Sequence, residues 1–276
     1  MQGTRKFPTE MATISPATAG NIPSPETVPT RLSAALFGVS MVIHQVNRGV
    51  TDLFSGLRRC HQVSGEAFSV VAAESRTRLW SDTRAAEAAY QSGKVQNLTR
   101  AVEELNGALL RRGQVFSFWR QIGRASRERG FVTGRMLQQG CMVPAVGGGL
   151  CQLSNALHDL ALQTGCEIIE RHAHSRVVPG SVAEAGRDAT VAWNYVDLRF
   201  RAPHALLIAA DVSHDELTVS FNVEPGTPLA LAGRRRSDAT VIQIAASLRP
   251  LGTANTCGTC EETRCFRKEH SDTIAR

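Results

Sequence analysis

Residues 147–163 carry the strongest pattern in this chain, and they read GGGLCQLSNALHDLALQ. Leu153, Leu157 and Leu160 recur at helical spacing, and Gly165 follows as a stop signal, so residues 151–163 are predicted to form an amphipathic helix. Three consecutive glycines cost conformational entropy on folding. The turn before the helix is therefore predicted to need unusual backbone angles or the close approach of a ligand.

Cys151 falls in the first turn of this predicted helix. The amides there are unpaired and carry a partial positive charge, which favours a thiolate and can stabilise an oxyanion. Cys151 therefore has the setting of a catalytic nucleophile. Two alternatives stay open: a buried structural cysteine, and an anion-binding turn built on Gly147, Gly148 and Gly149. The turn lacks the Lys-Ser/Thr pair of a Walker loop.

A partner base is expected from the next segment. A helix over residues 151–163 is about 20 Å long. An eight-residue strand over residues 167–174 is about 26 Å long, so a strand that runs back along the helix ends level with Cys151. That geometry brings His172 and His174 toward the thiol, since both point to one strand face. Asp188 and Asp197 are candidates to orient the imidazole.

The rest of the pattern predicts an α+β fold, in which an antiparallel sheet packs against helices. The expected helices cover residues 82–90 and a second segment that starts with Asn97 as its cap and stops at Gly107. Residues 123–134 are expected to be a polar loop. The expected strands are residues 114–119, 167–174, 189–202, 205–212 and 216–223.

Composition divides the chain into four parts: a polar, proline-bearing tail (1–30), an N-terminal extension (31–75), a main domain (76–224) and a C-terminal extension (225–276). The apolar run 32–43 is too short for a membrane span, which needs roughly 20 residues. It is expected to be a helix or a weak interfacial segment. With no clear signal peptide, a cytoplasmic location is expected, and export or membrane association is the alternative.

The C-terminal extension holds three of the seven cysteines, Cys257, Cys260 and Cys265, with His270 beyond them. Thiolates spaced C-x2-C-x4-C with a following histidine suit tetrahedral zinc, and an iron–sulfur cluster is also compatible. Free or disulfide-linked thiols are the alternative. No cofactor is expected for the main domain.

The main domain resembles the VanW family, bacterial proteins linked to cell-wall biology. The motifs that carry the resemblance occur in the family's order and cover a little over half the chain. They read ELNG (104–107), GQVFSF (113–118), GFVTG (130–134), GGGLCQLSN (147–155), ERHAHS (170–175), DATV (188–191) and YVDLR (195–199). His158 departs from the family pattern, which usually has an aromatic residue there.

The resemblance implies cysteine-dependent acyl transfer on peptidoglycan stem peptides, as in relatives thought to act as L,D-transpeptidases. Cys151 would then be the nucleophile, His174 rather than His172 the base, and Gln152 with the helix-start amides the oxyanion site. Ligand binding is expected from six residues: Gly147, Gly148, Gly149, Ser154, Asn155 and Arg171. The expected partner is a cell-wall precursor or stem peptide, and nucleic acid is not expected. A non-catalytic accessory protein of glycopeptide resistance is the competing interpretation.

Overall fold

The computed structural model describes residues 31–80, 85–138, 141–174, 186–213 and 215–228. The expected disordered tail, most of the C-terminal extension and the predicted metal ligands Cys257, Cys260, Cys265 and His270 lie outside these ranges. The described elements mix helices with antiparallel strands, which confirms the predicted α+β class.

A five-stranded antiparallel sheet forms the largest layer, in the order β1-β3-β9-β10-β2. Its strands are β1 (His61–Gln62), β2 (Val70–Arg78), β3 (Ala108–Leu110), β9 (Leu206–Ser213) and β10 (Glu216–Val223). The predicted strands 205–212 and 216–223 are therefore confirmed as the hairpin β9–β10 at the centre of this sheet. β2 crosses the boundary expected between residues 75 and 76 and pairs along its length with β10.

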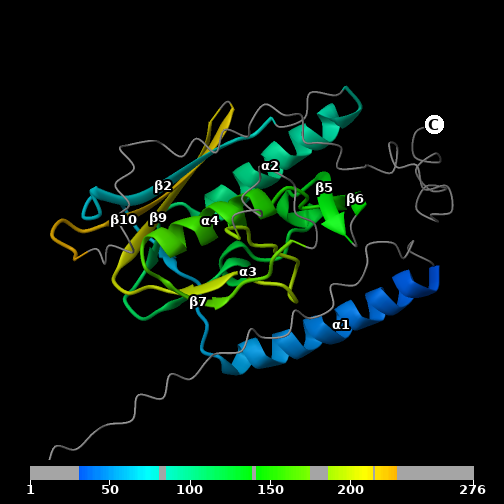
Figure 1. The fold of residues 1–276 in the computed structure, drawn as a ribbon, viewed down its shortest axis with the longest axis horizontal. Coiled ribbons are helices and arrows are strands. Elements are labelled where there is room, and N and C mark those ends of the chain that lie inside the picture. The colour runs from blue at the N-terminus through cyan, green and yellow to red at the C-terminus, as the bar shows by residue number, and fades with distance from the viewer. Residues whose placement is uncertain (1–30, 81–84, 139–140, 175–185, 214, 229–276) are drawn as a thin grey trace, which may run out of the picture.

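Two long helices, α2 (Ala88–Leu105) and α4 (Cys151–Gln163), contact this sheet: α2 packs on β9, and α4 on β2 and β10 (Figure 1). Leu153, Leu157 and Leu160 of α4 are fully buried, as their spacing predicted. A short helix, α3 (Phe118–Ile122), follows β4. Two single 3-10 turns complete the helical elements, η1 (Ala85–Glu87) and η2 (Arg127–Arg129).

A second, three-stranded sheet has the order β4-β8-β7, and a separate hairpin joins β5 to β6. The bounds of these strands are β4 (Val115–Ser117), β5 (Thr133–Gln138), β6 (Cys141–Val146), β7 (Glu167–Glu170) and β8 (Arg199–Arg201). Phe116 and Phe200 stack across the β4–β8 pair with ring centroids 4.8 Å apart, which ties the small sheet into the core.

Several predicted bounds are wrong. The strand predicted for 114–119 stops at Ser117, because the Ser117 hydroxyl accepts a hydrogen bond from the Arg120 amide and caps α3. The strand predicted for 167–174 ends at Glu170, and 189–202 is strand only over Arg199–Arg201. The loop expected at 123–134 leads into the unpredicted β5–β6 hairpin.

The predicted helix cap at Asn97 is also wrong, since one helix runs from Ala88 to Leu105 through it. Asn97 is fully buried. Its amide donates to the carbonyls of Val132 and Gly148 and accepts from the Val132 amide. An asparagine inside a helix interior is tolerated here because its side chain pairs backbone groups that would otherwise be buried unsatisfied.

The first helix, α1 (Arg31–Phe54), runs along the edge of the molecule in Figure 1 (blue), on the side of α3 and β7. The structure thus confirms a helix in the N-terminal extension. Among the described residues, no helix combines the length and apolarity that a membrane crossing requires.

Candidate functional site

The glycine turn and the hairpin beside it position the start of α4. Gly147 and Gly149 have φ angles of 79° and 100°, which side chains other than glycine's rarely adopt. A Cβ on Gly148 would lie 2.3 Å from the Gly134 carbonyl carbon. The turn therefore needs glycine partly for its backbone angles and partly because it packs directly on the backbone of β5. The predicted contact with a ligand is not tested by this packing.

Cys151 is the first residue of α4 and is half-buried. Its thiol lies 3.9 Å from the Val191 carbonyl and also forms a side-chain hydrogen bond with the His174 ring. The structure thus brings together the cysteine and the histidine that the resemblance paired. The helix–strand return that suggested this pairing is only partly present, because β7 ends at Glu170 and the chain reaches His174 in irregular structure.

Asp188 holds the His174 ring from the other side. One Asp188 carboxylate oxygen accepts hydrogen bonds from the backbone amide of His174 at 2.7 Å and from its Nδ1 at 2.6 Å. This contact occupies Nδ1 and leaves Nε2 for the Cys151 thiol. Cys151, His174 and Asp188 therefore form a thiol–imidazole–carboxylate chain, a geometry that acyl-transfer enzymes with activated nucleophiles also use.

The carboxylate of this chain is fixed from two directions. Arg171 donates to the other Asp188 oxygen at 2.5 Å and to the Asp188 carbonyl at 2.7 Å. Next to it, Ser154 donates to the Ala189 carbonyl, and Asn155 accepts from the Ala189 amide. Ser154 and Asn155, predicted to bind ligand, thus join the first turns of α4 to the Asp188 segment, and Arg171, predicted likewise, joins the end of β7 to it. Their ligand contacts stay a prediction.

The charges of the site follow from these contacts. Burial of the His174 ring opposes its protonation, but the hydrogen bonds and charges of Cys151 and Asp188 outweigh burial and raise its pKa above the ordinary value. Burial likewise opposes ionisation of Asp188, yet the His174 hydrogen bonds and the charges of His174 and Arg171 lower its pKa. An ionised Asp188 and an easily protonated His174 suit an imidazole that stabilises a thiolate.

Two other cysteines have the opposite setting. Burial raises the pKa of both Cys60 and Cys166 to about 11. Both thiols are buried in the core, with 4% and 7% of their surfaces exposed. The backbone of Cys141 lies in β6.

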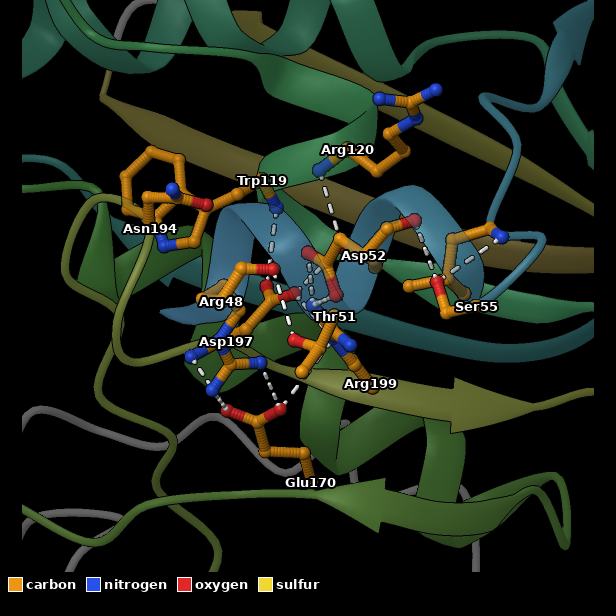
Figure 2. Close-up of polar contacts among 12 residues, drawn as sticks. Arg48, Thr51, Asp52, Ser55, Trp119, Arg120, Glu170, Asn194, Asp197 and Arg199 are labelled. Atoms are coloured by element: carbon orange, nitrogen blue, oxygen red, sulfur yellow. Dashed lines mark hydrogen bonds and ion pairs between the residues drawn. The ribbon is translucent and has the colours of Figure 1, made fainter. Parts of the chain in front are cut away.

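His172 and Asp197, the other sequence candidates, belong to a neighbouring network. His172 is exposed, and its Nε2 lies 3.2 Å from Glu170. Asp197 is buried and accepts from the Ser117 hydroxyl, the Trp119 amide and Arg199. Figure 2 shows Glu170, Asp197 and Arg199 clustered where α1 meets the small sheet. In the described part of the chain, neither the His172 nor the Asp197 side chain forms a hydrogen bond or ion pair with Cys151 or His174.

Gln152 and His158, both on α4, have partners of their own. The Gln152 side chain donates to the Thr77 hydroxyl at 2.8 Å and the Arg78 carbonyl at 3.0 Å, so its amide is directed at β2. His158 is buried with Nδ1 2.9 Å from the Arg187 carbonyl, and burial lowers its pKa. Within the described residues, the backbone amides of residues 149–151 donate no hydrogen bond, whereas the Gln152 amide is already engaged with β2.

Two residues that shape the site were not predicted to be site residues. Asn97 joins the glycine turn to β5 from a neighbouring helix, and Val191 supplies the carbonyl next to the thiol. The second has a sequence signal, because it belongs to the DATV motif that includes Asp188. Asn97 has no such sequence signal, because the sequence of a helix does not indicate that one of its side-chain amides contacts a turn far away in the chain.

Comparisons with known proteins agree with the resemblance. Residues 93–222 match the family model described as VanW like protein. The chain is 38% identical over 117 residues to the vancomycin B-type resistance protein VanW of Enterococcus faecalis, which covers 41% of this chain and 42% of that protein. It is 31% identical over 105 residues to the uncharacterized protein YoaR of Bacillus subtilis, covering 38% of this chain and 34% of that protein.

The chain therefore spans about two fifths and one third of the length of these two curated relatives. No solved structure matches it.

Proposed function

Because residues 93–222 belong to the VanW family, we propose that this protein transfers an acyl group of a cell-wall stem peptide through Cys151. The single observation that supports this best is the contact chain from the Cys151 thiol through the His174 ring to Asp188. The relative from Enterococcus faecalis is named for vancomycin B-type resistance, which agrees with a substrate from the cell wall.

In the proposed reaction the Cys151 thiolate attacks a peptide carbonyl carbon of the donor stem. The carbonyl oxygen becomes an oxyanion, which the backbone amides of residues 149–151 stabilise, since they have no hydrogen-bond partner among the described residues. The imidazolium of His174 then gives its proton to the departing amine, the C–N bond breaks and a thioester to Cys151 remains. Asp188 stabilises the imidazolium through Nδ1 during this step.

The second half of the reaction consumes the thioester. The amine of an acceptor stem attacks the thioester carbonyl, and His174, now neutral, removes the proton from that amine. The C–S bond breaks, the new peptide bond forms and the Cys151 thiolate is released with the imidazolium beside it. No oxidant or cofactor is needed for either half. Water in place of the acceptor amine would give hydrolysis instead of a cross-link.

The test is an incubation of the full chain with a purified stem tetrapeptide and a second stem peptide with a free side-chain amine. Intact-protein mass spectrometry should detect an acyl adduct on Cys151, and peptide analysis should detect the cross-linked product. Cys151→Ser should abolish both and keep the fold, since the volume change is small. A wild-type protein that forms neither adduct nor product, but binds the stem peptide, would support the accessory-protein alternative.

A further inference from the structure

Helix α1 meets the rest of the protein through polar side chains on one of its faces (Figure 2). Arg48 donates to both carboxylate oxygens of Glu170 at 2.5 and 2.6 Å, and Asp52 accepts two hydrogen bonds from Arg199. Gln45 donates to the Trp193 carbonyl at 3.0 Å. These contacting residues follow one another at three- and four-residue steps, so they form a single polar face.

The opposite face of α1 is apolar, and none of the residues that the structure describes packs over it. Seven large side chains on it have exposed fractions between 53% and 81%. They are Leu32, Leu36, Val39, Ile43, Val46, Val50 and Leu53. A helix that binds its own domain through ion pairs and leaves its aliphatic face in solvent has the reverse of the usual arrangement. Some further surface is therefore expected to cover this apolar face.

The spacing of the seven residues indicates which surface. Their separations alternate four, three, four, three, four and three along the chain. The mean step is 3.5 residues, the repeat with which a helix keeps one narrow seam against another helix. The seam places Leu36, Ile43 and Val50 at the a positions, with leucine or valine at the d positions. Two of the three a residues are β-branched and two of the four d residues are leucine, so the seam follows in part the pattern that favours two strands, β-branched residues at a with leucine at d.

We propose that α1 pairs with α1 of a second copy of this chain in a two-stranded coiled coil. The residues that flank the seam support an identical partner, because none of them is charged, and identical helices therefore bring no like charges together. They are Ser33, Ala35, Ser40, Val42, Asn47, Gly49 and Phe54. The ionic side chains of the polar face, Arg48 and Asp52, are held by the chain's own Glu170 and Arg199.

Three heptads are a short coiled coil, and most of the stability of a helix in a protein comes from packing one of its faces on other parts of the structure. The contacts with Glu170, Trp193 and Arg199 hold α1 on the folded domain and so lower the entropy that pairing must overcome. The same contacts connect the seam to β7 and to residues 193–199, close in sequence to His174 and Val191. The α1–α1 coiled coil would therefore fix the two Cys151 sites relative to each other. Dimer formation does not depend on acyl transfer at Cys151.

The test is sedimentation velocity on the full chain, in reductant and without lipid or detergent, across a wide concentration range. The wild-type protein should sediment as a dimer with about twice the 29.8 kDa chain mass. Ile43→Glu with Val46→Glu should weaken association by roughly 100-fold or more, since two charges would be buried in the seam. Leu162→Glu, an exposed leucine on α4, is the matched control and should leave the dimer intact.

Far-UV circular dichroism and alkylation of Cys151 check that the double variant is folded, because its substitutions are in solvent in the monomer. A wild-type protein that stays monomeric at every concentration would overturn the proposal. A dimer that the double variant does not weaken would overturn it as well. A monomer that binds anionic phospholipid vesicles through this face would replace the second chain with a membrane surface.

Discussion

The Nδ1 atom of His174 lies 2.6 Å from the carboxylate of Asp188, 14 residues further along the chain. The same carboxylate oxygen accepts the His174 backbone amide, and Arg171 holds the other oxygen. Both the position of the ring and its tautomer therefore depend on one buried carboxylate that is 1% exposed. This relationship makes His174 rather than His172 the base in the proposed mechanism.

Substituting Asp188 with Asn should lower the His174 pKa. The ring loses the negative charge and the charged hydrogen-bond acceptor that, together with Cys151, raise its pKa against the effect of burial. Acyl transfer should fall by about 100-fold or more, the range of a general acid–base contribution. NMR titration of the His174 ring measures the pKa directly. Asp211→Asn, at an exposed position, is the control, and an unchanged His174 midpoint in Asp188→Asn would contradict the assignment.

Stability should fall in acid partly through Glu170. Burial opposes its ionisation, but Arg48, the Asp197 amide and Arg199 lower its pKa below the unfolded value. A depressed folded pKa gives stability that is present above the unfolded pKa and is lost as pH falls through the folded pKa. Urea unfolding between about pH 6 and pH 3 should therefore show a falling free energy of unfolding, with a shallower fall in Glu170→Gln.

The matched control for this variant is Glu167→Gln, on the exposed side of the same strand, where the side chain is 65% exposed. It should change the free energy of unfolding by less than about 0.5 kcal/mol. Equal acid slopes for the wild type and Glu170→Gln would show that the contact between α1 and β7 contributes nothing to acid sensitivity.

The glycine turn should not accept even one methyl group. In Gly148→Ala the new Cβ would meet the Gly134 backbone at 2.3 Å, so two main-chain segments would have to separate. We expect a loss of about 3 kcal/mol or more in the free energy of unfolding, typical of severe overpacking. Gly38→Ala is the control because its Cβ would meet nothing within 4 Å. That variant should gain up to about 1 kcal/mol from helix propensity.

The elements and contacts that the sequence predicted correctly can be compared with those that it did not. Periodicity predicted α4 and the β9–β10 hairpin, because a helix stripe and an alternating strand are local properties. The Asn97 cap was wrong because its partners, Val132 and Gly148, come from distant segments. The β5–β6 hairpin was missed because its strands contain Gly134, Pro144 and several polar residues. These residue types do not give the pattern expected of a strand. The return of a strand along α4 suggested both His172 and His174 as partners of Cys151, and the family resemblance favoured His174. The strand itself is half as long as predicted.

The C-terminal cysteines remain a prediction from spacing. If Cys257, Cys260, Cys265 and His270 bind zinc or an iron–sulfur cluster, protein purified without oxygen should contain about one metal site per chain, in line with four ligands for one ion. Elemental analysis and an absorption spectrum distinguish the two. Cys257→Ser with Cys260→Ser should remove the metal. A colourless, metal-free wild-type protein would contradict this prediction.

The central claim is that His174 activates Cys151, and site-resolved alkylation tests it most directly. Full-length protein is treated with iodoacetamide at a series of pH values, and peptide mass spectrometry gives the rate at Cys151, Cys141, Cys60 and Cys166. With a pKa of about 11, Cys60 and Cys166 are ionised in only about one molecule in 10,000 at neutral pH, and burial shields them further. We expect Cys151 to react at least about 100-fold faster than these two, and His174→Ala to slow Cys151 alone. Equal rates at Cys151 and the other thiols, unchanged in His174→Ala, would contradict it.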